Sequence, residues 1–146
     1  MYTSCLEKQN QVKKLFAPCT TEEQKYEKII ELGRSQSPLN PSLKVPENLV
    51  KGCQSLMYMD SQFDGNVMIF KTDSDALISS GLAVLLIKVY SGETPEAILK
   101  CPPDYLEELG ISASLTPSRA NGLYSIHLRM KQEALKAIIR HSTQSF

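Results

Sequence analysis

The longest apolar run of the chain, from Leu82 to Val89, constrains the fold more than any other feature. It is far too short to cross a bilayer, and Lys88 interrupts it. The surrounding segment, up to about Tyr90, is typical of a helix that is apolar on nearly all sides, and such a helix has to be surrounded by other elements. The sequence therefore predicts a central buried helix, capped at its start within Asp73-Ser74-Asp75.

Two consecutive segments before this helix have the composition of β-strands. They are Ser55–Asp60 and Val67–Lys71, and the turn signal Asp64-Gly65-Asn66 lies between them, which predicts a β-hairpin. All other predicted elements are helices. The fold class that follows is α+β, with a small antiparallel sheet packed against several helices.

Two helices are expected before the hairpin. The first covers 4–16, with apolar contacts from Leu6, Val12, Leu15 and Phe16. The second begins at Thr20, which has capping-box spacing to Glu23, and ends with Gly33 at the position just after the helix. Prolines then predict an irregular connection over 35–47.

Three more helices are expected after the central one. Short helices begin at Thr94-Pro95 and near Pro103, because proline is favoured at the first helical position. A long helix opens at Thr116-Pro117. One of its faces is apolar at spacings of three and four residues: Leu123, Ile126, Met130, Ala134 and Ile138.

Length and charge narrow the class of protein. A chain of 146 residues fits one domain, 1–146, and can bury a core without disulfides or metal. Basic and acidic residues number 16 each, so nothing draws the chain to nucleic acid or to a membrane surface. The polar start, Met1–Lys8, has no signal pattern, and we expect a cytoplasmic protein.

The four cysteines are Cys5, Cys19, Cys53 and Cys101. They are widely spaced, without a Cys-x-x-Cys pair, and in a reducing compartment they are expected to be free thiols. Their spacing to the histidines does not support a metal site. The glycines form no phosphate-binding loop. We therefore expect neither a metal nor a cofactor.

Cys53 is the outstanding candidate for chemistry. It follows Gly52, whose conformational freedom can present a thiol at the tip of a loop, and a reactive thiol must be reachable and able to ionise. Three other residues have two readings each. Asp75 is a helix cap or a site residue, and Arg119 is a surface cation or the partner of an anion such as Asp75. His127 is a core histidine or a catalytic partner of Cys53.

Four strings in the chain resemble the SufE family. They occur in order and at the right separations over about 26–129: Tyr26–Gly33, Val50–Ser55, Asp73–Ala76 followed by Gly81-Leu82, and Leu115–Arg119 with Gly122-Leu123. The chain departs from the family at Tyr58, where tryptophan is frequent, and at Ala120-Asn121.

The resemblance implies a specific activity. SufE proteins take sulfur from a pyridoxal-phosphate cysteine desulfurase of the SufS type, stimulate it, and pass the sulfur to an iron–sulfur scaffold of the SufBCD type. They are sulfur carriers rather than enzymes, with an α+β fold similar to that of IscU-type scaffolds. The acceptor cysteine falls on Cys53. Control of its loop and partner docking fall on Gly52, Gln54, Asp75 and Arg119.

The persulfide is expected to be sheltered by Leu56, Met57 and the helix from Leu82. Three alternatives stay open: a scaffold that assembles a cluster itself, a hydrolase or transferase using Cys53 and His127, and a purely structural partner protein. The sequence also leaves open whether the chain forms a homodimer.

Overall fold

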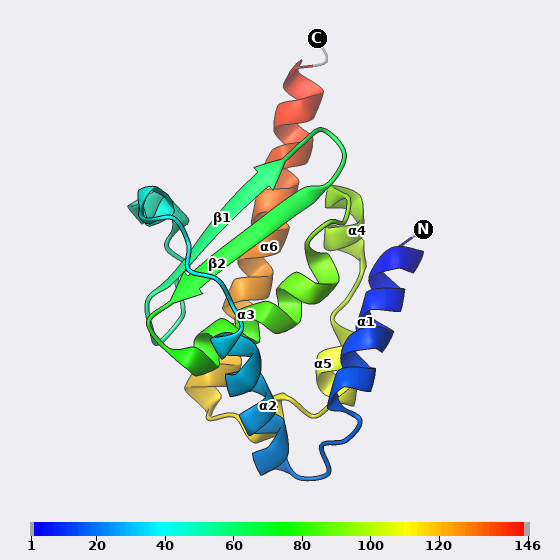
Figure 1. Cartoon of the computed structure of the whole chain (residues 1–146). Helices are drawn as coiled ribbons and strands as arrows, with labels where there is room; N and C mark the ends of the chain where they lie inside the picture. The colour runs from blue at the N-terminus through cyan, green and yellow to red at the C-terminus, as the bar shows by residue number, and fades with distance from the viewer. Residues whose placement is uncertain (1, 145–146) are drawn as a thin grey trace.

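The computed structural model describes residues 2–144 and has the predicted α+β architecture, with one hairpin packed against helices (Figure 1). Its elements, in chain order, are α1 (Thr3–Phe16), α2 (Glu22–Arg34), the 3-10 turns η1 (Pro41–Leu43) and η2 (Pro46–Asn48), β1 (Met57–Phe63), β2 (Met68–Ser74), α3 (Leu77–Tyr90), α4 (Pro95–Lys100), α5 (Asp104–Glu108), η3 (Ser112–Ser114) and α6 (Pro117–Gln144).

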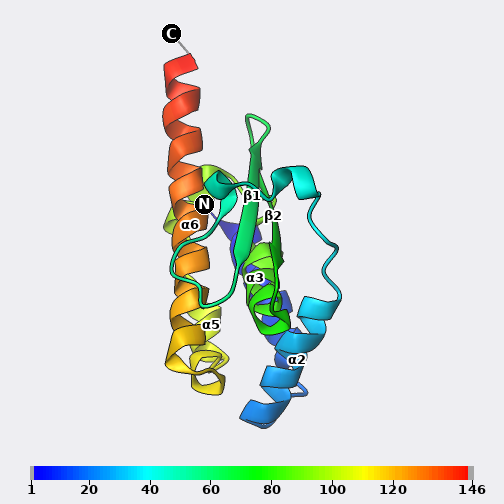
Figure 2. The same cartoon turned by 90° about the vertical axis from the view of Figure 1, so that its left-hand side faces the viewer.

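The hairpin is longer than the sequence predicted. β1 and β2 pair antiparallel, with Tyr58 opposite Asp73 and Phe63 opposite Met68. The predicted turn is present: the Asp64 carboxylate accepts hydrogen bonds from two backbone N–H groups of the turn, at 2.8 Å each. Seen in Figure 2, the hairpin lies between α6 on one side and the connection from α2 to η1 on the other.

α3 is the predicted central helix. Its residues Leu85, Leu86 and Val89 have no exposed surface, and the helix contacts α1, α2, α6 and β2. The predicted cap is wrong, however. β2 continues through Ser74, and the residue preceding the helix is Ala76, which makes no side-chain cap. The chain stays extended here because pairing with the start of β1 satisfies its backbone groups.

Two glycines bring α2 and α3 into close contact. A Cβ at Gly33 would overlap the carbonyl oxygen of Leu77, and a Cβ at Gly81 would overlap that of Ile29. Gly33 therefore lies inside α2 for packing, and not after its end as predicted. The capping box is also shifted by one residue, to Thr21 and Gln24.

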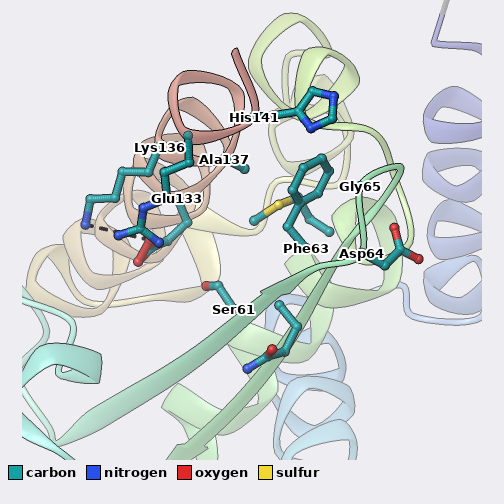
Figure 3. Close-up of a pocket in the computed structure, with 11 residues that line it drawn as sticks. Ser61, Phe63, Asp64, Gly65, Glu133, Lys136, Ala137 and His141 are labelled. Atoms are coloured by element: carbon teal, nitrogen blue, oxygen red, sulfur yellow. Dashed lines mark ion pairs between the residues drawn. The ribbon is translucent and has the colours of Figure 1, made fainter. Parts of the chain in front are cut away.

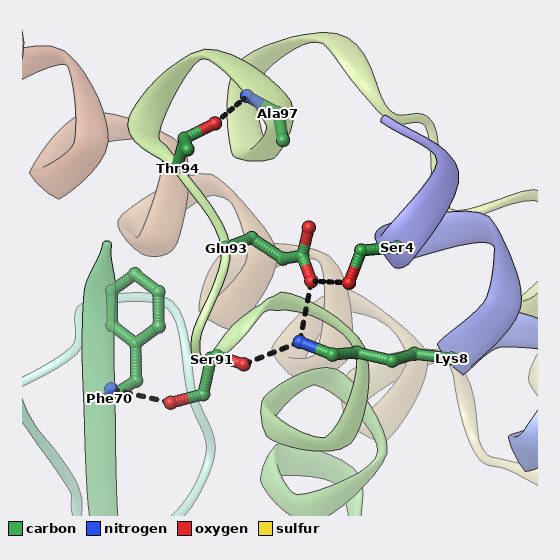
Figure 4. Close-up of polar contacts among 7 residues, drawn as sticks. All are labelled: Ser4, Lys8, Phe70, Ser91, Glu93, Thr94 and Ala97. Carbon is green, nitrogen blue, oxygen red and sulfur yellow. Dashed lines mark hydrogen bonds and ion pairs between the residues drawn. The ribbon is translucent and has the colours of Figure 1, made fainter. Parts of the chain in front are cut away.

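α1 is fastened to the rest of the fold by a polar cluster (Figure 4). The Glu93 side chain is only 5% exposed; its carboxylate pairs with Lys8 Nζ at 2.5 Å and accepts a hydrogen bond from Ser4 at 2.9 Å. Lys8 also donates to the Ser91 carbonyl at 2.9 Å. The predicted contact of Leu6 is wrong, since this side chain is 45% exposed and the helix buries Cys5 instead.

The long helix α6 covers the face of α3 that α2 leaves open (Figure 1). Its predicted apolar face is confirmed at Leu123, Ile126, Met130 and Ala134, all of which are buried. Four residues on its outer side remain exposed: Tyr124, Leu128, Leu135 and Ile139.

A candidate thiol site between the hairpin and the last helix

Residues 51–56, the Cys53 loop, connect η2 to β1 beside α6. The loop is closed at its base, because Val50 N–H donates to the Met57 carbonyl at 2.8 Å and Leu49 forms a bridge with Tyr58. Gly52 has a φ of +91°, a conformation that L side chains rarely adopt, and a Cβ here would overlap Ser125 Oγ of α6. The positive φ therefore favours glycine at this position, and a larger residue would also have to displace the Ser125 side chain.

Cys53 is half-buried and points at α6. Its Sγ lies 3.9 Å from the carbonyl oxygen of Gly122. It faces a cavity of about 10 Å³, which is close to the minimum that one water-sized group needs. The cavity is lined, besides Cys53, by Gln54, Ser79, Leu82, Ser118, Arg119, Gly122 and Ile126.

Two opposing effects act on the thiol. Burial raises the pKa of Cys53 above its ordinary value, and the positive charge of Arg119 lowers it in part. In the resting structure the net direction is upward, so the thiol form is favoured. A partner that opened the loop to solvent while Arg119 stayed near would increase the thiolate fraction.

Arg119 is held by serine hydroxyls and not by Asp75. Its Nη1 donates to Ser79 Oγ at 2.8 Å and lies 3.5 Å from Ser55 Oγ. Ser55 and Ser79 share a hydrogen bond of 2.6 Å, and Ser74 donates to Ser55 at 3.5 Å. The predicted Asp75 partner for Arg119 is therefore wrong, and the guanidinium still has donors free for an anion.

Asp75 instead fixes the end of the Cys53 loop. Its Oδ1 accepts a hydrogen bond from Leu56 N–H at 3.1 Å, and its own N–H donates to the Leu56 carbonyl at 3.3 Å. The Asp75 carboxylate thus takes the place of a backbone carbonyl and adds one hydrogen bond beyond the last β1–β2 pair, Met57 and Ser74. Its predicted role as a helix cap is wrong, because the residue preceding α3 is Ala76 and no side chain caps the helix.

The structure brings together most of the predicted site residues. Gly52 and Gln54 flank Cys53, and Arg119 faces it from the first turn of α6. The predicted shelter is correct only at Leu82, because Leu56 is 52% exposed and Met57 belongs to the core. Ile126, and not Leu56 or Met57, provides apolar shelter beside Leu82.

Besides Gly122 and Ile126, three serines of the site escaped the sequence analysis: Ser55, Ser79 and Ser118. Ser79 carried a partial signal that it shares with Ser80, since both are hydroxyls at the start of a largely apolar helix, where a buried polar group needs a partner.

His127 belongs to the core. It is 7% exposed, its ring centroid lies 5.0 Å from that of Tyr90, and it does not line the Cys53 cavity. Burial and the charge of Lys131 lower the pKa of His127 to about 4, so the ring is neutral at pH 7. The geometry therefore supports the reading of a core histidine.

The remaining cysteines lie elsewhere, and all four are free thiols, as predicted. Cys5 and Cys101 are buried, and burial raises the pKa of both thiols. Cys19 follows α1. Within residues 2–144, no group of three or more His, Cys, Asp or Glu side chains is placed to hold a metal ion.

A larger hollow of about 510 Å³ lies between the turn of the hairpin and the C-terminal half of α6 (Figure 3). Acidic and basic groups both line it, among them Asp64 and Arg140, and Lys136 pairs with Glu133 at 3.7 Å. None of the described residues that line this hollow is a cysteine, whereas Cys53 lines the smaller cavity.

A comparison with protein families matches residues 10–134 to "SufE: Fe-S metabolism associated domain". The match begins earlier and ends later than the resemblance expected over 26–129. It includes part of α1, which the sequence analysis did not recognise as a family segment.

Individual relatives agree with this match. The chain is 36% identical over 120 residues to the uncharacterized SufE-like protein slr1419 of Synechocystis sp., covering 82% of this chain and 76% of that protein. It is 34% identical to SufE-like protein 1, chloroplastic/mitochondrial, of Arabidopsis thaliana, over 94% of this chain but only 38% of that protein.

A solved structure shares the fold. The solution structure of a hypothetical protein from Thermus thermophilus superposes with a TM-score of 0.73 at 25% identity, covering 90% of this chain and 96% of the other. In the part of the chain that the structure describes, no helix is both long and apolar enough to span a membrane.

Proposed function

Because the chain belongs to the SufE family of Fe–S metabolism, we propose that it carries sulfur as a persulfide on Cys53. The sulfur would come from a SufS-like cysteine desulfurase and go on to a SufBCD-like scaffold for Fe–S clusters. The observation that carries this proposal is the half-buried Cys53 thiol, which lies beside a cation and faces a cavity of about 10 Å³.

The transfer is thiol exchange. The Cys53 thiolate attacks the outer sulfur of a persulfide on the desulfurase, a new S–S bond forms at Cys53, and the S–S bond on the desulfurase breaks. The desulfurase cysteine leaves as a thiolate, and the hydrogen of the persulfide travels with the transferred sulfur. Sulfur is passed without any net oxidation, and the pyridoxal phosphate stays on the desulfurase.

The resting geometry suits storage better than attack. The thiol is directed inward to Gly122, so an in-line approach by another protein requires the Cys53 loop to move outward. Gly52 with its positive φ on one side and the Asp75–Leu56 bonds on the other mark where the loop can pivot. After transfer, the returning loop would shelter the extra sulfur beside Leu82 and Ile126.

Arg119 has a second role in this proposal. Both of its serine contacts, to Ser55 and Ser79, are made by one nitrogen, Nη1. The rest of the guanidinium fork can therefore bind a carboxylate of the desulfurase. Docking would then draw Arg119 and the loop toward the partner together.

Intact mass measures the proposed reaction directly. The chain is incubated with cysteine and a SufS-like desulfurase, and wild type is compared with Cys53→Ser. We expect a gain of one sulfur atom, about 32 Da, that is absent in the variant. The triple variant Cys5→Ser, Cys19→Ser, Cys101→Ser is the matched control and should gain the same mass. A normal gain in Cys53→Ser would refute the proposal.

Other activities would give other results. An Fe–S scaffold needs several thiolate ligands and would develop iron-dependent visible absorbance on reconstitution. A cysteine hydrolase would turn over substrate with no desulfurase present.

A further inference from the structure

Ser79 lies at the point where three elements of the site meet. It is on α3, its residue is 5% exposed, and its hydroxyl contacts both the Arg119 guanidinium from α6, at 2.8 Å, and Ser55 of the Cys53 loop, at 2.6 Å. It also lines the Cys53 cavity. A buried hydroxyl with two such partners, one charged, ties them together more strongly than a solvent-exposed one would.

We propose that Ser79 is a positioning residue for sulfur transfer, which holds the Arg119 guanidinium beside Cys53 and, through Ser55, keeps the Cys53 loop in its inward position. The proposal deepens the sulfur-carrier function and rests on it for the identity of the reaction. Its effects on the free thiol, however, need no desulfurase to be observed.

The donors and acceptors around Ser79 explain how one hydroxyl can hold both the Arg119 guanidinium and the Cys53 loop. Nη1 of Arg119 can only donate, so Ser79 Oγ accepts from it, and the hydroxyl keeps one proton and one lone pair with which it can either donate to Ser55 or accept from it. Ser55 also accepts from Ser74 of β2. Removing the Ser79 hydroxyl therefore breaks both connections in one step.

Few charges face the thiol. Arg119 is the one charged side chain among the described residues that line the cavity, whose other members come from the loop, α3 and α6. Lys51 lies two residues before Cys53, and the Asp75 carboxylate is engaged with Leu56 N–H. A displacement of Arg119 is thus the main electrostatic change that a variant at Ser79 would cause at Cys53.

The test measures alkylation of Cys53 by iodoacetamide as a function of pH, with the Cys53 peptide quantified by mass spectrometry. Ser79→Ala is expected to raise the plateau rate at high pH, because the released loop exposes the thiol. The midpoint of the pH profile should fall, because exposure relieves the burial that raises the pKa of Cys53 by more than Arg119 lowers it. Arg119→Gln removes the cation but keeps the Ser79–Ser55 bond, so it should raise the midpoint instead.

Ser80→Ala is the matched control. Ser80 is the next residue on α3, is 6% exposed, and does not line the Cys53 cavity. Ser80→Ala should leave both the midpoint and the plateau of the alkylation profile at wild-type values. Ser55→Ala, at a less buried position, should reproduce the higher plateau if Ser79→Ala folds poorly by circular dichroism.

The outcomes separate this proposal from the proposed function. An unchanged profile in Ser79→Ala, or equal changes in Ser79→Ala and Ser80→Ala, would overturn the role of Ser79. If Ser79→Ala changes the alkylation profile as expected but no desulfurase transfers sulfur to the chain, the sulfur-carrier function is overturned. Ser79 would then remain the residue that positions the thiol.

Discussion

Asp75 and Leu56 are joined by two hydrogen bonds, one from Leu56 N–H to the Asp75 carboxylate at 3.1 Å and one from Asp75 N–H to the Leu56 carbonyl at 3.3 Å. The pair ends the Cys53 loop where the hairpin begins. An aspartate that resembles a helix cap in the sequence therefore acts on the loop and not on the helix.

Asp75→Ala should loosen the Cys53 loop and leave α3 intact. The lost bond is exposed, so we expect a cost in stability of no more than about 1 kcal/mol, together with faster alkylation of Cys53. Asp75→Asn keeps an acceptor oxygen and should behave nearly as wild type. A loss of helical circular dichroism in Asp75→Ala would instead support the cap.

Gly52→Ala should damage the loop far more than a glycine substitution at the hairpin turn. Gly65 has a similar φ of +95°, but nothing lies within 4 Å of its would-be Cβ, whereas at Gly52 the Cβ overlaps Ser125. We expect about 1 kcal/mol of backbone strain in Gly65→Ala, and a further 1–3 kcal/mol, roughly, from overlap in Gly52→Ala. Urea unfolding measures both, and only Gly52→Ala should slow sulfur uptake.

His127 should make the fold less stable in acid. Its pKa is about 4 in the folded chain and ordinarily about 6.5, so the unfolded state binds the proton more readily between these values. The contribution of the neutral ring is complete above about pH 6.5 and is lost as the pH falls toward 4, by up to about 3 kcal/mol.

Denaturant unfolding at pH 7 and pH 4.5 checks this dependence. Other groups also titrate over this range, so the comparison is with His127→Gln, which cannot take the proton. The loss of stability between the two pH values should be smaller in the variant. Equal losses in both proteins would show that His127 is not the group responsible.

Lys8→Met should destabilise the fold because it leaves the buried Glu93 carboxylate without its cation. Lys8 is 25% exposed, so the penalty is below that of a fully buried pair, about 1–3 kcal/mol. Lys13, which pairs with the exposed Glu108, offers a matched control on the same helix. Lys13→Met should cost less than about 0.5 kcal/mol in urea unfolding.

Much of the fold could be predicted because its signals are local. The apolar run of α3, the turn at Asp64, and the Thr94-Pro95 and Thr116-Pro117 starts each act within a few residues, and the structure confirms them. Boundaries were less certain where local and long-range bonds compete. At Asp75, a cap would satisfy the helix, but the hairpin offers partners to both the backbone and the side chain.

The sequence by itself determined the α+β class, the central helix and the Gly52-Cys53 pair with Arg119, because these depend on periodicity, turn chemistry and motif order. Only the tertiary structure decided what surrounds the thiol. Ser55, Ser79 and Arg119 are far apart in the chain, and no local rule predicts which hydroxyl a guanidinium will contact. Packing of α6 and β2 against α3 brings them together, and the packing of α6 directs His127 to the core and away from Cys53.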